Sequence, residues 1–144
     1  MLQNEKDLLL KDLCARLPYG VIVKDEWVNF TGRLDQIATR YLMRTLYNSE
    51  NDEDELCNIN YCKPYLFPLS SMTEEQWMDI PYANLNKFTF DSFKCGCSTL
   101  TFETYEVNLS YVVKFINWCY KNHFDIYGLI PMGLATDATG LKIY

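Results

Sequence analysis

The chain has 144 residues, of which 49% are hydrophobic and 15% aromatic, so it has enough apolar surface for a folded core and is not a disordered protein. Its net charge is −6, from 13 basic and 19 acidic residues, and five of the acids fall in residues 50–55. Because the chain has no cluster of lysines and arginines to neutralise the phosphates of DNA or RNA, we expect no nucleic-acid partner.

No apolar run approaches the roughly 18 residues of a membrane-spanning helix, and the first seven residues are polar and acidic rather than a secretion signal. We therefore expect a cytoplasmic protein without a membrane partner, whose six cysteines are thiols. The length suits a single domain over residues 1–144.

The first predicted element is a helix that Asn4 caps and Pro18 ends. Glu5 and Asp7 suit the positive end of its dipole. Apolar residues recur at helical spacing, so one stripe of this helix should face a core. The members of the stripe are Leu9, Leu10, Leu13, Cys14 and Leu17.

Residues 19–69 read as mainly β. The expected elements are a strand at 21–23, a turn at Asp25 and Glu26, an extended stretch at 27–30 up to a bend or bulge at Gly32, and strands at 41–47, 56–61 and 65–69. Short, bent strands after a helix predict a small half-barrel of the SH3-like or Sm-like kind, because closure hides the sheet edges.

Residues 70–144 combine helices, a hairpin and an irregular tail, so the fold class is α+β. Thr73 with Gln76, or Ser71 with Glu74, forms a capping box that starts a short helix over residues 73–79. The elements expected next are a β-hairpin at 88–102, a C-terminal helix at 108–122 and a tail of turns with one short helical piece at 124–144. The buried stripe of the C-terminal helix is predicted to be Leu109, Val112, Val113, Ile116, Cys119 and Tyr120.

Three blocks of the chain carry a resemblance that spans most of its length; they are residues 8–21, residues 63–66 with 70–75, and residues 123–125 with 128–130 and 133–135. In these blocks the chain resembles a family of small uncharacterised proteins from phages and mobile elements of gut anaerobic bacteria. The resemblance implies a small protein in the cytoplasm of the bacterial host. It assigns no catalytic residue, and Pro131 stands where relatives carry a charged residue.

Cys119, His123 and Asp125 are the set closest to a catalytic arrangement, because a cysteine nucleophile needs a thiolate, an imidazole and an orienting carboxylate. The structural alternative is that Cys119 packs in the buried stripe and His123 lies at a helix C-terminus. We favour the structural alternative and expect no catalytic residue, which leaves a small hydrolase as the least favoured function.

Cys57, Cys62, Cys95 and Cys97 are candidates for a zinc site. Structural zinc sites usually repeat a Cys-x2–4-Cys spacing, whereas Cys95 and Cys97 are separated by a single residue. We therefore prefer incidental thiols and expect neither a metal nor a cofactor. The sequence does not decide whether the four cysteines meet in space.

Two sets of residues are candidates for binding. Arginines and tyrosines that meet on one β surface would suit a nucleotide-type ligand, and this set consists of Arg33, Arg40, Tyr41, Arg44 and Tyr47. Trp77, with the neighbouring Met72 and Met78, forms either an exposed docking face or part of the core.

The surplus of aromatic residues and the lack of a coherent catalytic set lead to the main hypothesis. It is a non-enzymatic binding protein that docks a host protein through an aromatic-rich surface. The alternative is a protein that binds a nucleotide-type small molecule. Exposed aromatic residues are also consistent with a homodimer, and the sequence leaves the partner, the ligand and the oligomeric state open.

Overall fold

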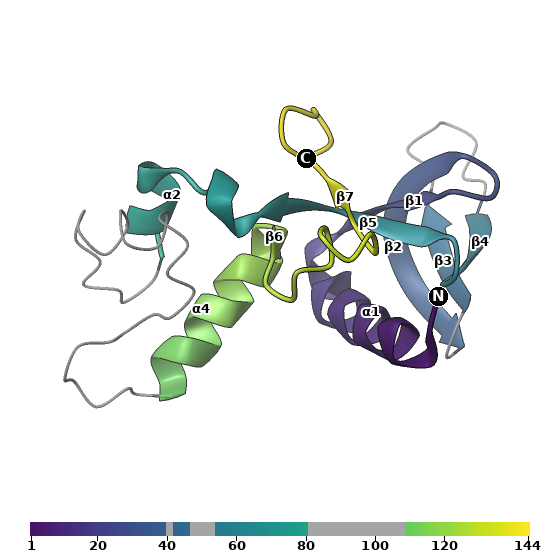
Figure 1. The fold of residues 1–144 in the computed structure, drawn as a ribbon, viewed down its shortest axis with the longest axis horizontal. Helices are drawn as coiled ribbons and strands as arrows, with labels where there is room; N and C mark the ends of the chain where they lie inside the picture. Colours follow the sequence, from purple (N-terminus) through teal and green to yellow (C-terminus); the bar gives the residue numbers. More distant parts are fainter. Residues whose placement is uncertain (40–41, 47–53, 81–108) are drawn as a thin grey trace.

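The structure is a computed structural model that describes residues 1–39, 42–46, 54–80 and 109–144 (Figure 1). It has the expected α+β class, with an N-terminal helix, a small open sheet and a C-terminal helix. The elements are α1 (Gln3–Arg16), η1 (Leu17–Tyr19), β1 (Ile22–Asp25), β2 (Phe30–Thr39), β3 (Leu42–Leu46), β4 (Asp54–Asn58), β5 (Cys62–Pro68), η2 (Leu69–Ser71), α2 (Glu74–Met78), α4 (Leu109–Lys121), β6 (Phe124–Asp125) and β7 (Thr136–Asp137). The hairpin expected at 88–102 lies outside the described residues.

Helix α1 begins earlier than predicted. Asn4 lies inside the helix rather than at its cap, because the Leu2 N–H donates to the Glu5 carboxylate at 2.6 Å and sets the helix start there. The helix ends at Arg16, and Pro18 sits in the following 3-10 turn rather than closing the helix itself.

The buried stripe of α1 also differs from the prediction. Leu9 and Leu13 are buried as expected, but Cys14 is exposed. The stripe is completed by Asp12, three residues after Leu9, and by Arg16, three residues after Leu13, so both share the face of the leucines. The charged Asp12 and Arg16 are therefore buried at positions that the spacing of apolar residues predicts to face solvent.

The strands form one sheet in the order β4-β3-β2-β1-β5-β6, and β7 also pairs with β5. Strands β1 to β5 pair antiparallel along this path, whereas β6 and β7 run parallel to β5. The prediction of turns with one short helical piece for residues 124–144 missed two short strands of this tail, which pair with β5.

Two local predictions in the sheet were wrong. Residues 27–29 form the turn between β1 and β2 rather than an extended stretch. Gly32 pairs regularly with Val23, and the irregularity of β2 falls instead between Leu34 and Gln36. The strands predicted at 41–47, 56–61 and 65–69 are present as β3, β4 and β5, with shifted ends.

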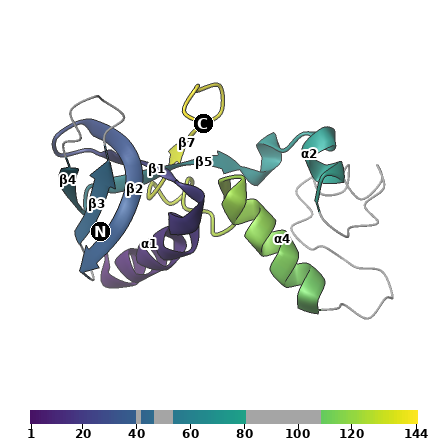
Figure 2. The ribbon, with the colours of Figure 1, turned by 180° about the vertical axis from the view of Figure 1, so that it is seen from behind.

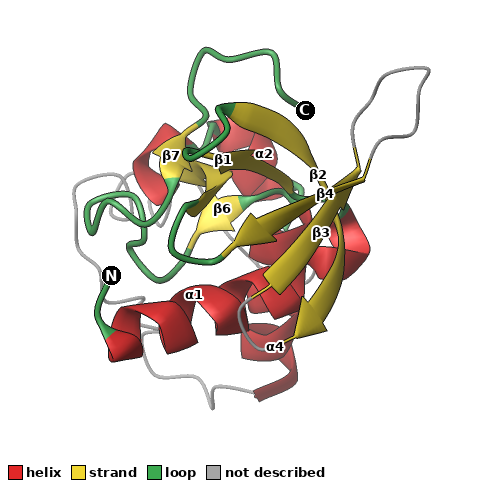
Figure 3. Cartoon of the chain, turned by 90° about the vertical axis from the view of Figure 1, so that its right-hand side faces the viewer, coloured by secondary structure: helices red, strands yellow, loops and turns green. Residues whose placement is uncertain are grey.

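The sheet is strongly curled (Figure 3). Strands β4 and β5 stand four strand spacings apart on the path, which is about 19 Å in a flat sheet. Only residues 59–61 join them, and a chain of that length reaches at most about 14 Å. The Tyr61 N–H donates to the Asn58 carbonyl at 2.9 Å, so the link is a tight turn and the two outer strands must approach one another.

The main core lies between α1 and the concave face of the curled sheet. It contains Leu9 and Leu13 of the helix, residues of β1, β2, β4 and β5, and Leu129, Leu134 and Ala135 of the tail. Strand β5 then runs out of the sheet toward η2 and α2, and α4 lies beside this end of the molecule (Figure 2).

A second apolar cluster holds that end together; its buried members are Met72, Trp77, Ile80, Trp118, Cys119 and Phe124. The predicted capping box starts α2, since the Gln76 N–H donates to the Thr73 hydroxyl at 3.1 Å and the Thr73 N–H donates to the Gln76 side chain at 2.9 Å. Val113, predicted to be buried on α4, is exposed, and Trp118 takes a buried place instead. Among the described helices, none combines the length and apolar character needed to cross a membrane.

Candidate functional site

Two groups of side chains stand out against the rest of the fold. We call the first the Arg16 hub; it consists of the buried Asp12, Arg16, His123 and Phe124 together with Tyr144, which is 48% exposed. We call the second the Trp27 hollow; it lies at the surface and is lined by Asp25, Trp27, Val28, Leu56, Asn58 and Tyr61.

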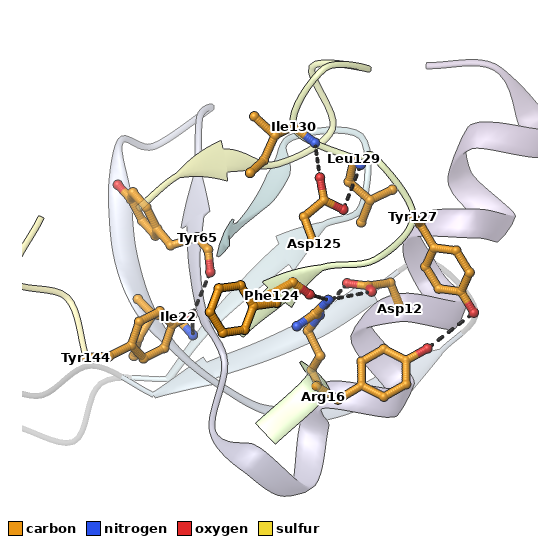
Figure 4. A network of polar contacts seen from close by, with 11 residues as sticks. Asp12, Arg16, Ile22, Tyr65, Phe124, Asp125, Tyr127, Leu129, Ile130 and Tyr144 are labelled. Atoms are coloured by element: carbon orange, nitrogen blue, oxygen red, sulfur yellow. Dashed lines mark hydrogen bonds and ion pairs between the residues drawn. The ribbon is translucent and has the colours of Figure 1, made fainter. Parts of the chain in front are cut away.

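The Arg16 hub is centred on a fully buried ion pair within α1 (Figure 4). Arg16 donates through Nε to Asp12 Oδ2 at 2.7 Å and through Nη2 to Asp12 Oδ1 at 3.0 Å. Nη2 also donates to the Phe124 carbonyl at 2.7 Å, so the guanidinium ties α1 to β6. Burial raises the pKa of Asp12, and the charge of Arg16 and its hydrogen bonds oppose that rise.

His123 and Tyr144 close one side of the hub. Their rings stack at 3.8 Å with an angle of 8° between the planes. The Tyr144 hydroxyl donates to the Tyr65 carbonyl at 2.7 Å and accepts from the Ile22 N–H at 3.2 Å, so this ring also holds β1 and β5 (Figure 4). Burial, and to a lesser extent the charge of Arg16, lower the pKa of His123 to about 4.

The candidate catalytic set does not assemble. The Asp125 carboxylate accepts the N–H groups of Leu129 and Ile130 at 2.9 and 2.8 Å, so it stabilises the turn that follows β6 instead of orienting His123. Cys119 is fully buried, and burial raises the pKa of its thiol to about 12, which disfavours a reactive thiolate. The geometry supports the structural alternative for Cys119 and His123, and it gives Asp125 a structural role as well.

The Trp27 hollow is built by the turn between β1 and β2. Asp25 Oδ1 accepts from the N–H of Trp27 at 2.7 Å and from that of Val28 at 3.4 Å, and Asn29 adopts a positive φ of 53°. This side-chain-stabilised turn leaves Trp27 74% exposed.

The opposite side of the hollow comes from β4 and the turn after it. Leu56 is 63% exposed and lies in β4, and Tyr61 lies in the turn that leads to β5. The rings of Trp27 and Tyr61 have centroids 5.2 Å apart and planes inclined by 41°. The Glu26 N–H donates to the Tyr61 carbonyl at 2.9 Å, which fixes the two turns against each other.

Together these side chains enclose a shallow volume of about 290 Å³. Most surface apolar residues of a soluble protein are scattered singly and need no explanation. Here Trp27, Val28, Leu56 and Tyr61 lie together around one hollow, and they come from segments that are far apart in the sequence. Such a grouping is typical of a binding surface.

The chemistry of the hollow suits binding rather than catalysis. The lining residues that the structure describes include no histidine, serine or cysteine. The neighbouring Cys57 is buried, and its contact with the Cys62 thiol, then burial, raise the pKa of Cys57. In the ranges that the structure describes, no group of three or more His, Cys, Asp or Glu side chains is placed to hold a metal ion.

The binding residues predicted from the sequence have different outcomes. Trp77 is 1% exposed in the second apolar cluster, so the core interpretation of Trp77 holds and the docking interpretation was wrong. Arg33 is exposed on β2. In the strand register, Arg44 of β3 lies opposite Gln36 of β2 and Leu56 of β4. Arg40, Tyr41, Tyr47, Cys95 and Cys97 lie outside the described residues, so the arginine and tyrosine set stays a prediction.

The hollow itself was not predicted from the sequence. One signal was available, because an aspartate two residues before a Trp-Val pair can accept backbone N–H groups and form a turn. Comparisons of the chain with protein-family models, with curated proteins and with solved structures found no match. The function is therefore judged from the geometry of the site.

Proposed function

We propose that the protein is a non-enzymatic binding protein that docks a protein of the bacterial host through the Trp27 hollow. The observation that carries this proposal is the exposure of two facing aromatic rings, Trp27 and Tyr61, beside the apolar Val28 and Leu56. Tryptophan and tyrosine are enriched among the residues that dominate protein interfaces, because each buries a large rigid surface at a small cost in entropy. The phage-like resemblance of the sequence supports a host protein as the partner.

The scaffold that we propose for this surface is an SH3-like half-barrel. The strand order β4-β3-β2-β1-β5 and the short link over residues 59–61 support it, since both bring the outer strands together. The pairing of Asp25 in β1 with Cys62 in β5 puts the β1–β2 turn beside the β4–β5 turn, and the hollow lies between them.

A nucleotide-type ligand is less well supported at this site. Among the described residues, the hollow is lined by the carboxylate of Asp25 and by no arginine or lysine, so this lining offers no counter-charge to a phosphate. Glu26, next to Asp25, already pairs with Lys63 at 3.0 Å. The site therefore favours an uncharged or cationic group of a protein partner.

Site-specific photo-crosslinking tests the proposal. A benzophenone amino acid replaces Val28 in the hollow, and in a control protein it replaces Met132, which is 46% exposed in the tail and outside the hollow. In cells of the natural host, we expect the Val28 position to capture one defined protein and the Met132 position not to. The same protein, once purified, should bind the unmodified chain.

A matched pair of variants completes the test. Trp27→Ala with Leu56→Ala should abolish binding of the purified partner, whereas Met132→Ala should leave its affinity unchanged. Equal affinity in both variants would contradict docking through the hollow. Capture only of a second copy of this chain would assign the hollow to a homodimer and overturn the host-protein proposal.

A further inference from the structure

We propose that the segment bound in the Trp27 hollow is an extended, proline-rich stretch of the partner that carries an arginine or a lysine. This inference rests on the proposed function and names the chemical class of the partner segment. Three properties of the hollow support it: its size, its inclined rings and its acidic lining.

The size of the hollow favours a narrow, extended ligand. A volume of about 290 Å³ accommodates a few side chains. An α-helix with its side chains is about 10–12 Å across, so it would touch the rim of such a shallow hollow without filling it. An extended chain can place single residues into the hollow and continue past it in both directions.

The inclined rings favour proline among extended segments. The rings of Trp27 and Tyr61 pack against each other, with 5.2 Å between centroids and 41° between planes, and together they present an apolar surface on which a proline ring can pack. Proline-rich segments adopt the polyproline II conformation before binding, so ordering them costs little. Aromatic-lined grooves are a recurrent way of binding such segments.

Hydrogen bonding agrees with this ligand. A polyproline II segment makes no internal hydrogen bonds, so its carbonyl groups accept from outside. The rim of the hollow is built from residue types with donors, namely the indole of Trp27, the hydroxyl of Tyr61 and the amide of Asn58. Donors that sit among aromatic rings match a ligand that is rich in acceptors and poor in N–H groups.

The acidic lining favours a cation in the segment. Of the lining residues that the structure describes, Asp25 is the charged one, and it is largely buried, so its charge is less screened than that of a surface acid. The chain as a whole carries a charge of −6, which adds a weaker attraction for a basic partner. Arginine or lysine next to the prolines would meet both conditions.

An extended segment could instead add a strand to β4, which supplies Leu56 and Asn58 to the hollow. Strand addition depends on the backbone of β4, whereas Trp27 and Tyr61 lie in two turns that such a pairing does not use. The position of the rings therefore favours the proline-rich segment, and strand addition becomes an outcome of the test.

The test measures binding of synthetic decapeptides to the full chain by titration calorimetry and by tryptophan fluorescence. The probe peptide has a Pro-x-x-Pro core with an arginine beside it. One control peptide has alanine for both prolines, and another has glutamate for the arginine. The fluorescence reports on the hollow, because Trp27 is exposed while Trp77 and Trp118 are buried.

We expect saturable binding of the probe peptide with a change in Trp27 emission. Trp27→Ala should weaken it at least about tenfold, and Met132→Ala should not change it. Asp25→Asn keeps a side-chain oxygen for the turn but removes the charge, so it should weaken the probe about fivefold. The same variant should not weaken a peptide that has the prolines and lacks the arginine.

The possible failures are distinguishable. If the alanine peptide binds as well as the probe, strand addition replaces the proline-rich segment. If no peptide binds but the crosslinked partner still depends on Trp27, the segment class is wrong and docking through the hollow stands. If neither peptides nor a partner depend on Trp27, both the inference and the proposed function fail.

Discussion

Proteins usually bury apolar side chains and expose charged ones. The Arg16 hub departs from this pattern by burying charges, and the Trp27 hollow departs from it by exposing aromatic rings. In the hub the charged pair of Asp12 and Arg16 is fully buried, and Arg16 donates hydrogen bonds to Asp12 and to the Phe124 carbonyl. In the hollow, two aromatic rings that would suit a core face solvent. The first arrangement connects parts of the fold, whereas the second is not required by any part of the described fold.

This difference separates architecture from function. Burial of a charge is costly, so the fold must supply partners for it, and those partners join α1 to β6. Exposure of a ring costs the fold little, and the grouping of exposed rings with apolar neighbours is the basis of the binding proposal. Substitutions in the hub should therefore reduce stability, while substitutions in the hollow should reduce binding.

The largest effect is expected for Arg16→Met. This substitution leaves the Asp12 carboxylate buried without its partner and removes the donor to the Phe124 carbonyl. We expect the free energy of unfolding to fall by about 3–5 kcal/mol, as measured by urea denaturation. A loss below about 1 kcal/mol would show that the hub does not hold α1 to β6.

The double variant Asp12→Leu with Arg16→Met serves as the control. It removes both charges, so no uncompensated carboxylate remains, and replacing a buried pair by apolar residues is often close to neutral. The Phe124 carbonyl still loses its donor, which costs about 1–3 kcal/mol. The double variant should therefore be more stable than Arg16→Met alone, and a lower stability would contradict this account of the pair.

These two residues also show why part of the fold could not be predicted. Thr73 and Gln76 start α2 as expected, because a capping box depends on neighbours in the sequence. The burial of Arg16 depends on the Phe124 carbonyl, more than 100 residues away, and no local pattern contains that contact. Propensity and periodicity therefore predict where helices and strands lie. The burial of the charged residues of α1 is decided by tertiary contacts.

The next effect is a pH dependence that arises in the hub. In the folded protein burial lowers the pKa of His123 to about 4, below its ordinary 6.5, so the unfolded chain binds the proton first as pH falls. Stability should be complete above about pH 6.5 and fall as the pH drops toward 4. A shift of this size corresponds to roughly 3 kcal/mol, measurable by urea denaturation across this range.

His123→Asn isolates the contribution of the imidazole. Asparagine tolerates the positive φ of 59° at this position and does not titrate in the range. The pKa of Asp12 is raised, so its contribution has the opposite sign: stability is lost as pH rises through its folded pKa. Asp12 is present in both proteins, and equal pH slopes in the two would contradict the role given to His123.

A smaller effect is expected for Tyr144→Phe, which keeps the ring on His123 and removes the hydroxyl. The Ile22 N–H and the Tyr65 carbonyl then lose their partner. We expect a loss of about 1–2 kcal/mol in the free energy of unfolding. Tyr127→Phe is a suitable control because its hydroxyl contacts only the Tyr120 hydroxyl among the described hydrogen bonds, at 3.2 Å. Equal losses in the two variants would remove the special role of Tyr144.

The candidate site was harder to predict than the fold, and the two tryptophans illustrate the reason. Both stand next to residues with good local signals, a capping box before Trp77 and a turn-forming aspartate before Trp27. Those signals predict the backbone conformation but not which side of it meets the core. Trp77 is buried because α2 packs on Trp118 and Phe124, and these partners are distant in the sequence.

The smallest effect on stability is expected for Trp27→Ala, and it separates the hollow from the hub most directly. The side chain is 74% exposed, so truncation should change the free energy of unfolding by no more than about 0.5 kcal/mol. Trp77→Ala, the matched substitution of a buried tryptophan, should cost about 3–5 kcal/mol. If Trp27→Ala were instead as damaging as Trp77→Ala, the ring would belong to the architecture, and its exposure would no longer argue for a binding partner.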